Sequence, residues 1–97
     1  MSYYGLGLTY LNAKKFQAAH DNFVWAIDIS KRLVLKDRYL ENFRRLFPLK
    51  LYLYGYAGAK RFYDGEKEFF ENTVDPAPTF QNLIYDAGAF MRSLLGN

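Results

Sequence analysis

The sequence contains no cysteine, a single histidine and no long apolar run. The missing cysteine excludes disulfides, thiolate metal sites and cysteine nucleophiles. Because small secreted domains usually need such covalent staples, we expect an intracellular, soluble protein, cytoplasmic or in an organellar lumen. The longest apolar stretch, Leu51 to Ala59, is about half the length of a membrane-spanning helix. We therefore expect no membrane span, and Met1 to Tyr4 has no signal-peptide pattern.

The sequence lacks the groups of residues that a catalytic site or a metal site needs. His20 is the only histidine, so no His pair is available for a metal. Asp21 follows it directly, but we expect neighbouring residues on a helix to point in different directions. The acidic residues Glu66, Glu68 and Glu71 are predicted to lie on a solvated helix face rather than in a cleft. The sequence therefore predicts a protein that is not an enzyme and that binds no metal or cofactor.

Aromatic residues are abundant: nine Tyr, nine Phe and one Trp make up 20% of the 97 residues. The length predicts a single domain over residues 1–97, which buries about 60–65% of the surface of its unfolded chain. Each aromatic side chain covers about 150–250 Å². We expect some of the rings at the surface, where Tyr and Trp are typical of protein interfaces. The simpler alternative is half-buried rings whose hydroxyl groups reach water.

Charge is segregated along the chain, although the net charge is only +3. Six basic residues oppose two acidic ones between Lys31 and Arg45, and six acidic residues oppose one basic residue between Asp64 and Asp86. These two segments are suited to attract each other or to attract different partners.

Apolar residues recur at helical spacing along almost the whole chain. The pattern predicts roughly six helices joined by short turns, over residues 2–13, 15–34, 37–47, 49–59, 64–74 and 79–95. Leu33 and Val34 complete the apolar stripe of the second segment. Residues 49–59 alternate in a way that also fits a strand, but no second strand is available for pairing, so a helix is predicted.

The boundaries of these helices rest on a few residues with clear preferences. Asp37, Asp64 and Thr79 are predicted to cap helices, since short polar side chains accept hydrogen bonds from the first free backbone N–H groups. Pro48 is predicted to end one helix or to begin the next.

Residues 3–30 resemble one tetratricopeptide repeat, a helix–turn–helix unit. The matching positions are Tyr3, Leu6, Gly7, Tyr10, Phe16, Ala19, Phe23 and Ala26. Gly7 and Ala19 are small where the two helices of such a unit cross. Lys31 stands near the place of the usual closing proline. Residues 1–60 are also weakly similar to the helical-repeat region of PCI-type proteasome-lid and signalosome subunits, which implies an architecture of stacked helical hairpins.

Together these features predict an all-α fold, a compact, tetratricopeptide-like stack of about three helical hairpins. The expected function is a protein–protein interaction scaffold or a small accessory subunit of a larger assembly. Its partners would be other protein subunits, in a hetero-complex or a homo-oligomer. The predicted contact residues are surplus aromatics with a charged rim, namely Tyr3, Tyr4, Trp25, Arg44, Arg45, Tyr52, Tyr54 and Tyr56.

Nucleic-acid binding is the alternative function. The basic residues between Lys31 and Arg45 could form a ridge along the phosphate backbone, with Tyr39 or Tyr52 stacked on bases. Against this, several of these residues are three or four positions from Asp28, Asp37 and Glu41, which favours weak pairing within a helix. The net charge is also modest for a nucleic-acid-binding domain.

Overall fold

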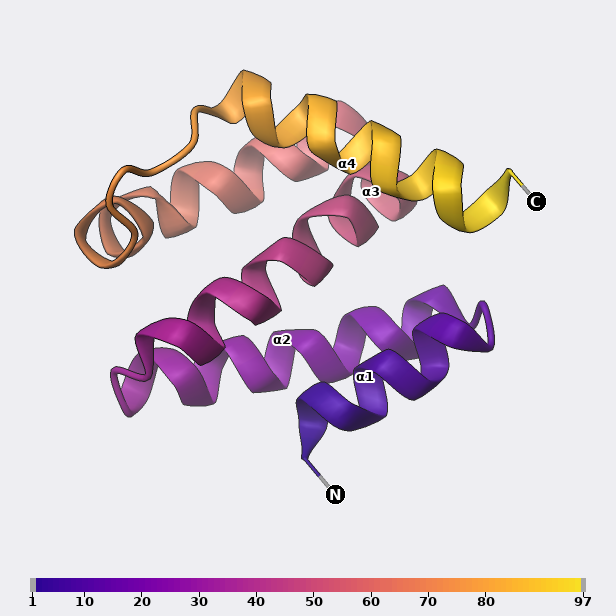
Figure 1. Cartoon of the computed structure of the whole chain (residues 1–97), viewed down its shortest axis with the longest axis horizontal. Coiled ribbons are helices and arrows are strands. Elements are labelled where there is room, and N and C mark those ends of the chain that lie inside the picture. The colour runs from indigo at the N-terminus through magenta and orange to yellow at the C-terminus, as the bar shows by residue number, and fades with distance from the viewer. Residues whose placement is uncertain (1, 97) are drawn as a thin grey trace. The chain divides into compact units, whose positions relative to one another are not determined.

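The computed structural model describes residues 2–96 (Figure 1). Within this range the chain forms no strand and four helices: α1 (Tyr3–Asn12), α2 (Phe16–Arg32), α3 (Lys36–Thr73) and α4 (Phe80–Leu95). The predicted all-α class is therefore confirmed, and residues 49–59 are helical. Among the described residues, no helix is both long enough and apolar enough to cross a bilayer. The chain divides into two units, the first ending at Leu46 and the second beginning at Phe47.

A glycine sets the crossing of α1 and α2, which form a helical hairpin in the first unit. Gly7 is buried, and a Cβ atom at this position would lie only 2.6 Å from the Phe23 ring. The missing side chain therefore allows the Phe23 ring to pack directly on the backbone of α1. Tyr4 packs on the same ring, with 5.8 Å between the ring centroids. Ser2 caps α1, because the Gly5 N–H donates to Ser2 Oγ at 3.0 Å.

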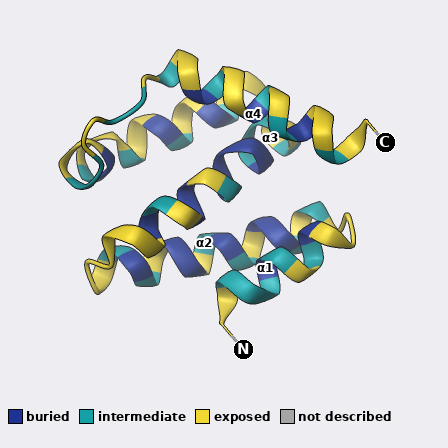
Figure 2. Ribbon diagram, viewed as in Figure 1, coloured by how far each residue is buried: buried dark blue, intermediate teal, exposed yellow. Residues whose placement is uncertain are grey.

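One face of each helix packs into the core of the first unit (Figure 2). Its buried apolar residues are Leu11, Ala19, Phe23, Ala26, Ile27, Tyr39, Phe43 and Leu46. The stripe predicted along α2 is correct up to Ser30, but its extension to Leu33 and Val34 is wrong. Helix α2 ends at Arg32, and these two side chains are 63% and 60% exposed in the turn that follows.

Helix α3 continues through the two boundaries predicted within it, one at Pro48 and one between residues 59 and 64. It is interrupted at a different residue. Pro48 lies inside the helix, where it removes one backbone N–H donor. The neighbouring Phe47 and Leu49 are fully buried, and this packing outweighs the local preference of proline. The interruption falls at Gly55, with φ 75° and ψ −173°. Only glycine adopts this backbone conformation readily, so Gly55 is the residue that allows the break.

Of the three predicted caps, only Thr79 is one. The Asn82 N–H donates to Thr79 Oγ1 at 3.1 Å at the start of α4. Asp37 lies within the first turn of α3 instead of preceding it. Asp64 lies inside α3, where its Oδ1 accepts a hydrogen bond from Lys60 Nζ at 2.8 Å. This hydrogen bond raises the pKa of the exposed Lys60 ammonium above its ordinary value.

In the second unit, aromatic rings join α3 to α4. Phe80, the first residue of α4, contacts Tyr56 at 5.4 Å, Tyr63 at 5.2 Å and Phe47 at 5.9 Å between ring centroids. Along α4 the buried residues recur every four positions, which is the spacing of a single helix face. These residues are Leu83, Ala87 and Met91.

Candidate functional site

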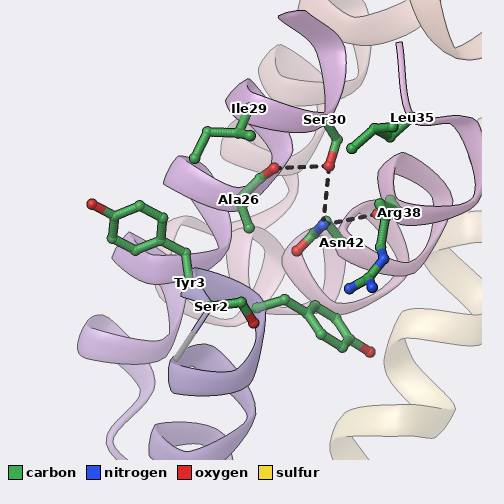
Figure 3. A pocket seen from close by; sticks show the side chains of 9 residues that line it. Ser2, Tyr3, Ala26, Ile29, Ser30, Leu35, Arg38 and Asn42 are labelled. Atoms are coloured by element: carbon green, nitrogen blue, oxygen red, sulfur yellow. Dashed lines mark hydrogen bonds between the residues drawn. The ribbon is translucent and has the colours of Figure 1, made fainter. Parts of the chain in front are cut away.

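A pocket of about 210 Å³ lies in the first unit, where three chain segments meet (Figure 3). Its walls come from the start of α1, the second half of α2 and the beginning of α3 with the turn before it. The lining residues are Ser2, Tyr3, Tyr4, Ala26, Ile29, Ser30, Leu35, Arg38 and Asn42. A concave surface that is mainly apolar, with a few converging polar groups, has the composition of a binding site.

The polar floor of the pocket is formed by Asn42, which is only 2% exposed. Its Nδ2 donates to the backbone carbonyl of Arg38 at 2.8 Å and to Ser30 Oγ at 3.5 Å. Since the carbonyl can only accept, this contact fixes which end of the amide carries the nitrogen. Ser30 Oγ in turn donates to the Ala26 carbonyl at 2.9 Å. These bonds hold the Asn42 side chain in one orientation.

That orientation leaves a buried acceptor facing the pocket. Asn42 Oδ1 accepts no hydrogen bond from the protein. Figure 3 shows this oxygen turned away from Ser30 and Arg38, towards the interior of the pocket. Burying an acceptor without a donor costs about 1–3 kcal/mol, so a ligand that brings an N–H or O–H group there gains most of that energy back.

Three of the predicted contact residues come together beside this pocket. Tyr3 lines it and stacks on Trp25, with ring centroids 6.3 Å apart and an interplanar angle of 29°. Trp25 is 56% exposed and Tyr3 is 44% exposed, so the stacked pair presents its rings to solvent. Tyr4 also lines the pocket, although its ring is partly buried on Phe23. The stacked pair forms an exposed aromatic lip.

The two predicted rim arginines do not contribute to the pocket. Arg44 is exposed and Arg45 is half-buried, both on α3 before Leu46. The guanidinium-bearing residue that does line the pocket is Arg38, two turns earlier. The charged edge of this site is thus supplied by Arg38, a member of the basic segment between Lys31 and Arg45 that is not among the predicted contact residues.

The remaining three predicted contact residues lie in the second unit. Tyr52, Tyr54 and Tyr56 are each about half exposed, next to the interruption at Gly55. Tyr54 borders a second hollow, and Lys50 Nζ lies 5.5 Å from the centre of its ring. The eight predicted contact residues are therefore divided between two units instead of forming one surface within either of them.

His20 and Asp21 meet, contrary to the expectation that they point apart. His20 Nδ1 lies 2.9 Å from Asp21 Oδ1, and Gln17 Nε2 donates to the same carboxylate oxygen at 3.0 Å. The His20 side chain is buried. No cluster of three or more potential metal ligands occurs within residues 2–96. The three side chains form a local network on the first half of α2.

Asn42 and Ser30 are the site residues that sequence reasoning missed. Ser30 lies among the buried residues of α2, and Asn42 lies between Tyr39 and Phe43 on α3. A polar amide at a core position is the only sequence feature that pointed to a buried polar site.

In comparisons with protein-family models, curated proteins and solved structures, nothing matches this chain. The resemblance of residues 3–30 to a tetratricopeptide repeat, and that of residues 1–60 to PCI-type subunits, therefore stay predictions.

Proposed function

We propose that this chain is a protein–protein interaction module, acting as a scaffold or a small accessory subunit of a larger assembly. The pocket of the first unit receives a segment of the partner protein. The observation that carries this proposal is the Asn42 Oδ1 acceptor, buried at the floor of an apolar pocket beside the Tyr3–Trp25 lip.

A polypeptide segment has the chemistry that this site requires. Its backbone supplies an N–H donor for Asn42 Oδ1, and an adjacent apolar side chain fills the space next to Ala26 and Ile29. The exposed rings of Tyr3 and Trp25 cover a large apolar area at little cost in side-chain entropy, as aromatic contact residues do in protein interfaces.

We also propose that the α1–α2 hairpin is a unit of the tetratricopeptide type. In support, Gly7 lies directly against the Phe23 ring, and Ala19 is fully buried, as the resemblance implies. Helical hairpins of this kind bury their faces by stacking on neighbouring hairpins, and they bind partners through the surfaces left open. The pocket is one such surface.

Selection from a phage-displayed random peptide library tests the proposal. Binding of the selected peptides can be followed through the fluorescence of Trp25, the only tryptophan, because it stacks on a residue of the pocket. We expect Tyr3→Ala and Asn42→Leu each to weaken the affinity by about tenfold, equivalent to ~1.4 kcal/mol. Tyr3 is exposed enough for its replacement to leave the fold intact.

Tyr85→Ala provides the matched control, because this tyrosine is 74% exposed on α4, outside the pocket. It should bind the selected peptides as tightly as the unmodified chain does. Peptides that bind all three variants equally well would contradict the proposal, as would a library that yields no binder.

The nucleic-acid alternative makes a different prediction for the same chain. Affinity for a short oligonucleotide should fall steeply with salt and be lost in Arg44→Ala with Arg45→Ala. One member of the basic segment, Arg32, is already paired with Asp28 at 2.9 Å. Oligonucleotide binding that does not change with salt would exclude this alternative.

A further inference from the structure

Two turns in the first unit have the same backbone structure. The first, Ala13 to Lys15, follows α1, and the second, Leu33 to Leu35, follows α2. In the first, the Lys15 N–H donates to the Tyr10 carbonyl at 2.9 Å and the Lys14 N–H donates to the Leu11 carbonyl at 3.0 Å. In the second, the N–H groups of Leu35 and Val34 donate to the carbonyls of Ser30 and Lys31, at 2.9 and 3.2 Å. Both are Schellman motifs, which end a helix by satisfying its last carbonyl groups.

The central residue of each turn has a left-handed backbone, with φ 58° at Lys14 and φ 53° at Val34. Glycine or asparagine is the usual residue at this position. A β-branched residue with positive φ is a clear outlier, because its two Cγ atoms crowd the neighbouring carbonyl groups. Valine is thus among the least suitable residues for the backbone of the second turn.

Burial does not compensate for this strain. Leu33, Val34 and Leu35 are 63%, 60% and 44% exposed. The turn between α2 and α3 is accordingly coloured as exposed in Figure 2. Leu33 and Val34 face solvent and contribute little to the core, and Leu35, which also lines the pocket, is still nearly half exposed. We call these three residues the aliphatic turn.

Basic residues flank the aliphatic turn on both sides. Between Lys31 and Arg38, four of the eight residues are basic and only Asp37 is acidic. Lys36 and Arg38 are exposed at the start of α3, and Arg32 is exposed at the end of α2, where it also pairs with Asp28. The first turn also carries two lysines, but its only apolar residue is Ala13.

We propose that the aliphatic turn inserts into the surface of an anionic lipid bilayer, with the flanking basic side chains at the level of the headgroups. An apolar tip surrounded by positive charge matches both layers of such a surface, the acyl boundary and the negative headgroups. A nucleic acid would contact the charges but has no apolar layer for three aliphatic side chains. The lipid surface is therefore the partner that fits both the aliphatic side chains and the basic residues around them.

Co-sedimentation with vesicles tests this proposal on the whole chain. The two vesicle types are pure phosphatidylcholine and phosphatidylcholine with about one-third phosphatidylserine. We expect binding to the anionic vesicles only, weakened about tenfold by Leu33→Ser with Val34→Asn. Asparagine tolerates a left-handed backbone, so this variant keeps the turn. Leu95→Ser at the end of α4 is the matched control, because Leu95 is also an exposed leucine, at 43%, but belongs to the second unit, and this variant should bind unchanged.

The charges are tested by two matched reversals. Lys36→Glu should weaken binding about tenfold, because a basic residue near an anionic surface contributes roughly a fivefold change in affinity and an acidic residue is repelled. Lys15→Glu makes the same change in charge at the last residue of the first turn and should have little effect.

Three results would overturn the proposal. One is equal binding of the Leu33→Ser/Val34→Asn variant and the unmodified chain, which would leave only non-specific charge attraction. Another is an equal loss of binding in Lys36→Glu and Lys15→Glu. The last is a short RNA that displaces the unmodified chain from the vesicles and binds the Leu33→Ser/Val34→Asn variant as tightly as it binds the unmodified chain.

Discussion

The two turns of the first unit combine one backbone with two contrasting sets of side chains. The turn after α1 reads Ala13-Lys14-Lys15, and the turn after α2 reads Leu33-Val34-Leu35. Main-chain groups make the hydrogen bonds in both turns, so the motif tolerates either set. The side chains of such a turn are therefore free to suit the surroundings of the turn. For the first turn these are water, and for the second, according to our proposal, they are a lipid surface.

Proline substitution tests most strongly whether the two turns are equivalent. Lys15→Pro and Leu35→Pro each remove the N–H that closes the motif and push the preceding residue towards an extended backbone. We expect each variant to lower the free energy of unfolding by about 2–4 kcal/mol, as measured by urea denaturation. If the free energy of unfolding stayed the same after proline substitution in one of the turns, the hydrogen bonds of that turn would not be what stabilises the helix end.

Glycine substitution tests how the turns differ in strain. Val34→Gly should raise the free energy of unfolding by about 1 kcal/mol, because removal of the β-branched side chain relieves more strain than the added entropy of the unfolded chain costs. Lys14→Gly should change it by less than half as much, since lysine is not branched at Cβ. Thermal unfolding of both variants measures the difference. A lower melting temperature for Val34→Gly would contradict the assignment of strain to Val34.

The smallest expected effect concerns the charges near the aliphatic turn. Arg32 and Asp28 form an ion pair with a distance of 2.9 Å, in which both side chains are more than half exposed. Exposed pairs of this spacing contribute about 0.3–0.5 kcal/mol. Asp28→Asn should therefore lower the free energy of unfolding by no more than that, and the difference should disappear at about 1 M salt. A larger effect would mean that these charges serve the fold.

The helices could be predicted from the sequence because their apolar faces are periodic. The stripe of α2 up to Ser30 and the Thr79 cap of α4 follow directly from spacing and side-chain type. The end of α2 could not be predicted, because the motif that ends it contains neither glycine nor asparagine. The boundaries predicted at Pro48 and Asp64 are wrong for the opposite reason, because both residues have a strong local preference that is overridden. At Pro48 it is overridden by the burial of its neighbours, and at Asp64 by the side-chain hydrogen bond from Lys60.

The pocket could be predicted only in part. Tyr3 and Tyr4 are among the predicted contact residues, and both line the pocket. The Asn42 acceptor depends on the meeting of α1, α2 and α3, and on the hydrogen bond to the Arg38 carbonyl that fixes the amide. Spacing along one helix contains no information about such a meeting, so Asn42 was not singled out.

The most direct measurement is the free energy of unfolding of a variant that carries side chains of the first turn in the second, Leu33→Ala with Val34→Lys. If the aliphatic side chains serve a partner surface, urea denaturation should give a value equal to that of the unmodified chain within about 0.5 kcal/mol, or higher. A value lower by more than about 1.5 kcal/mol would contradict this, because it would show that Leu33 and Val34 are needed by the fold itself.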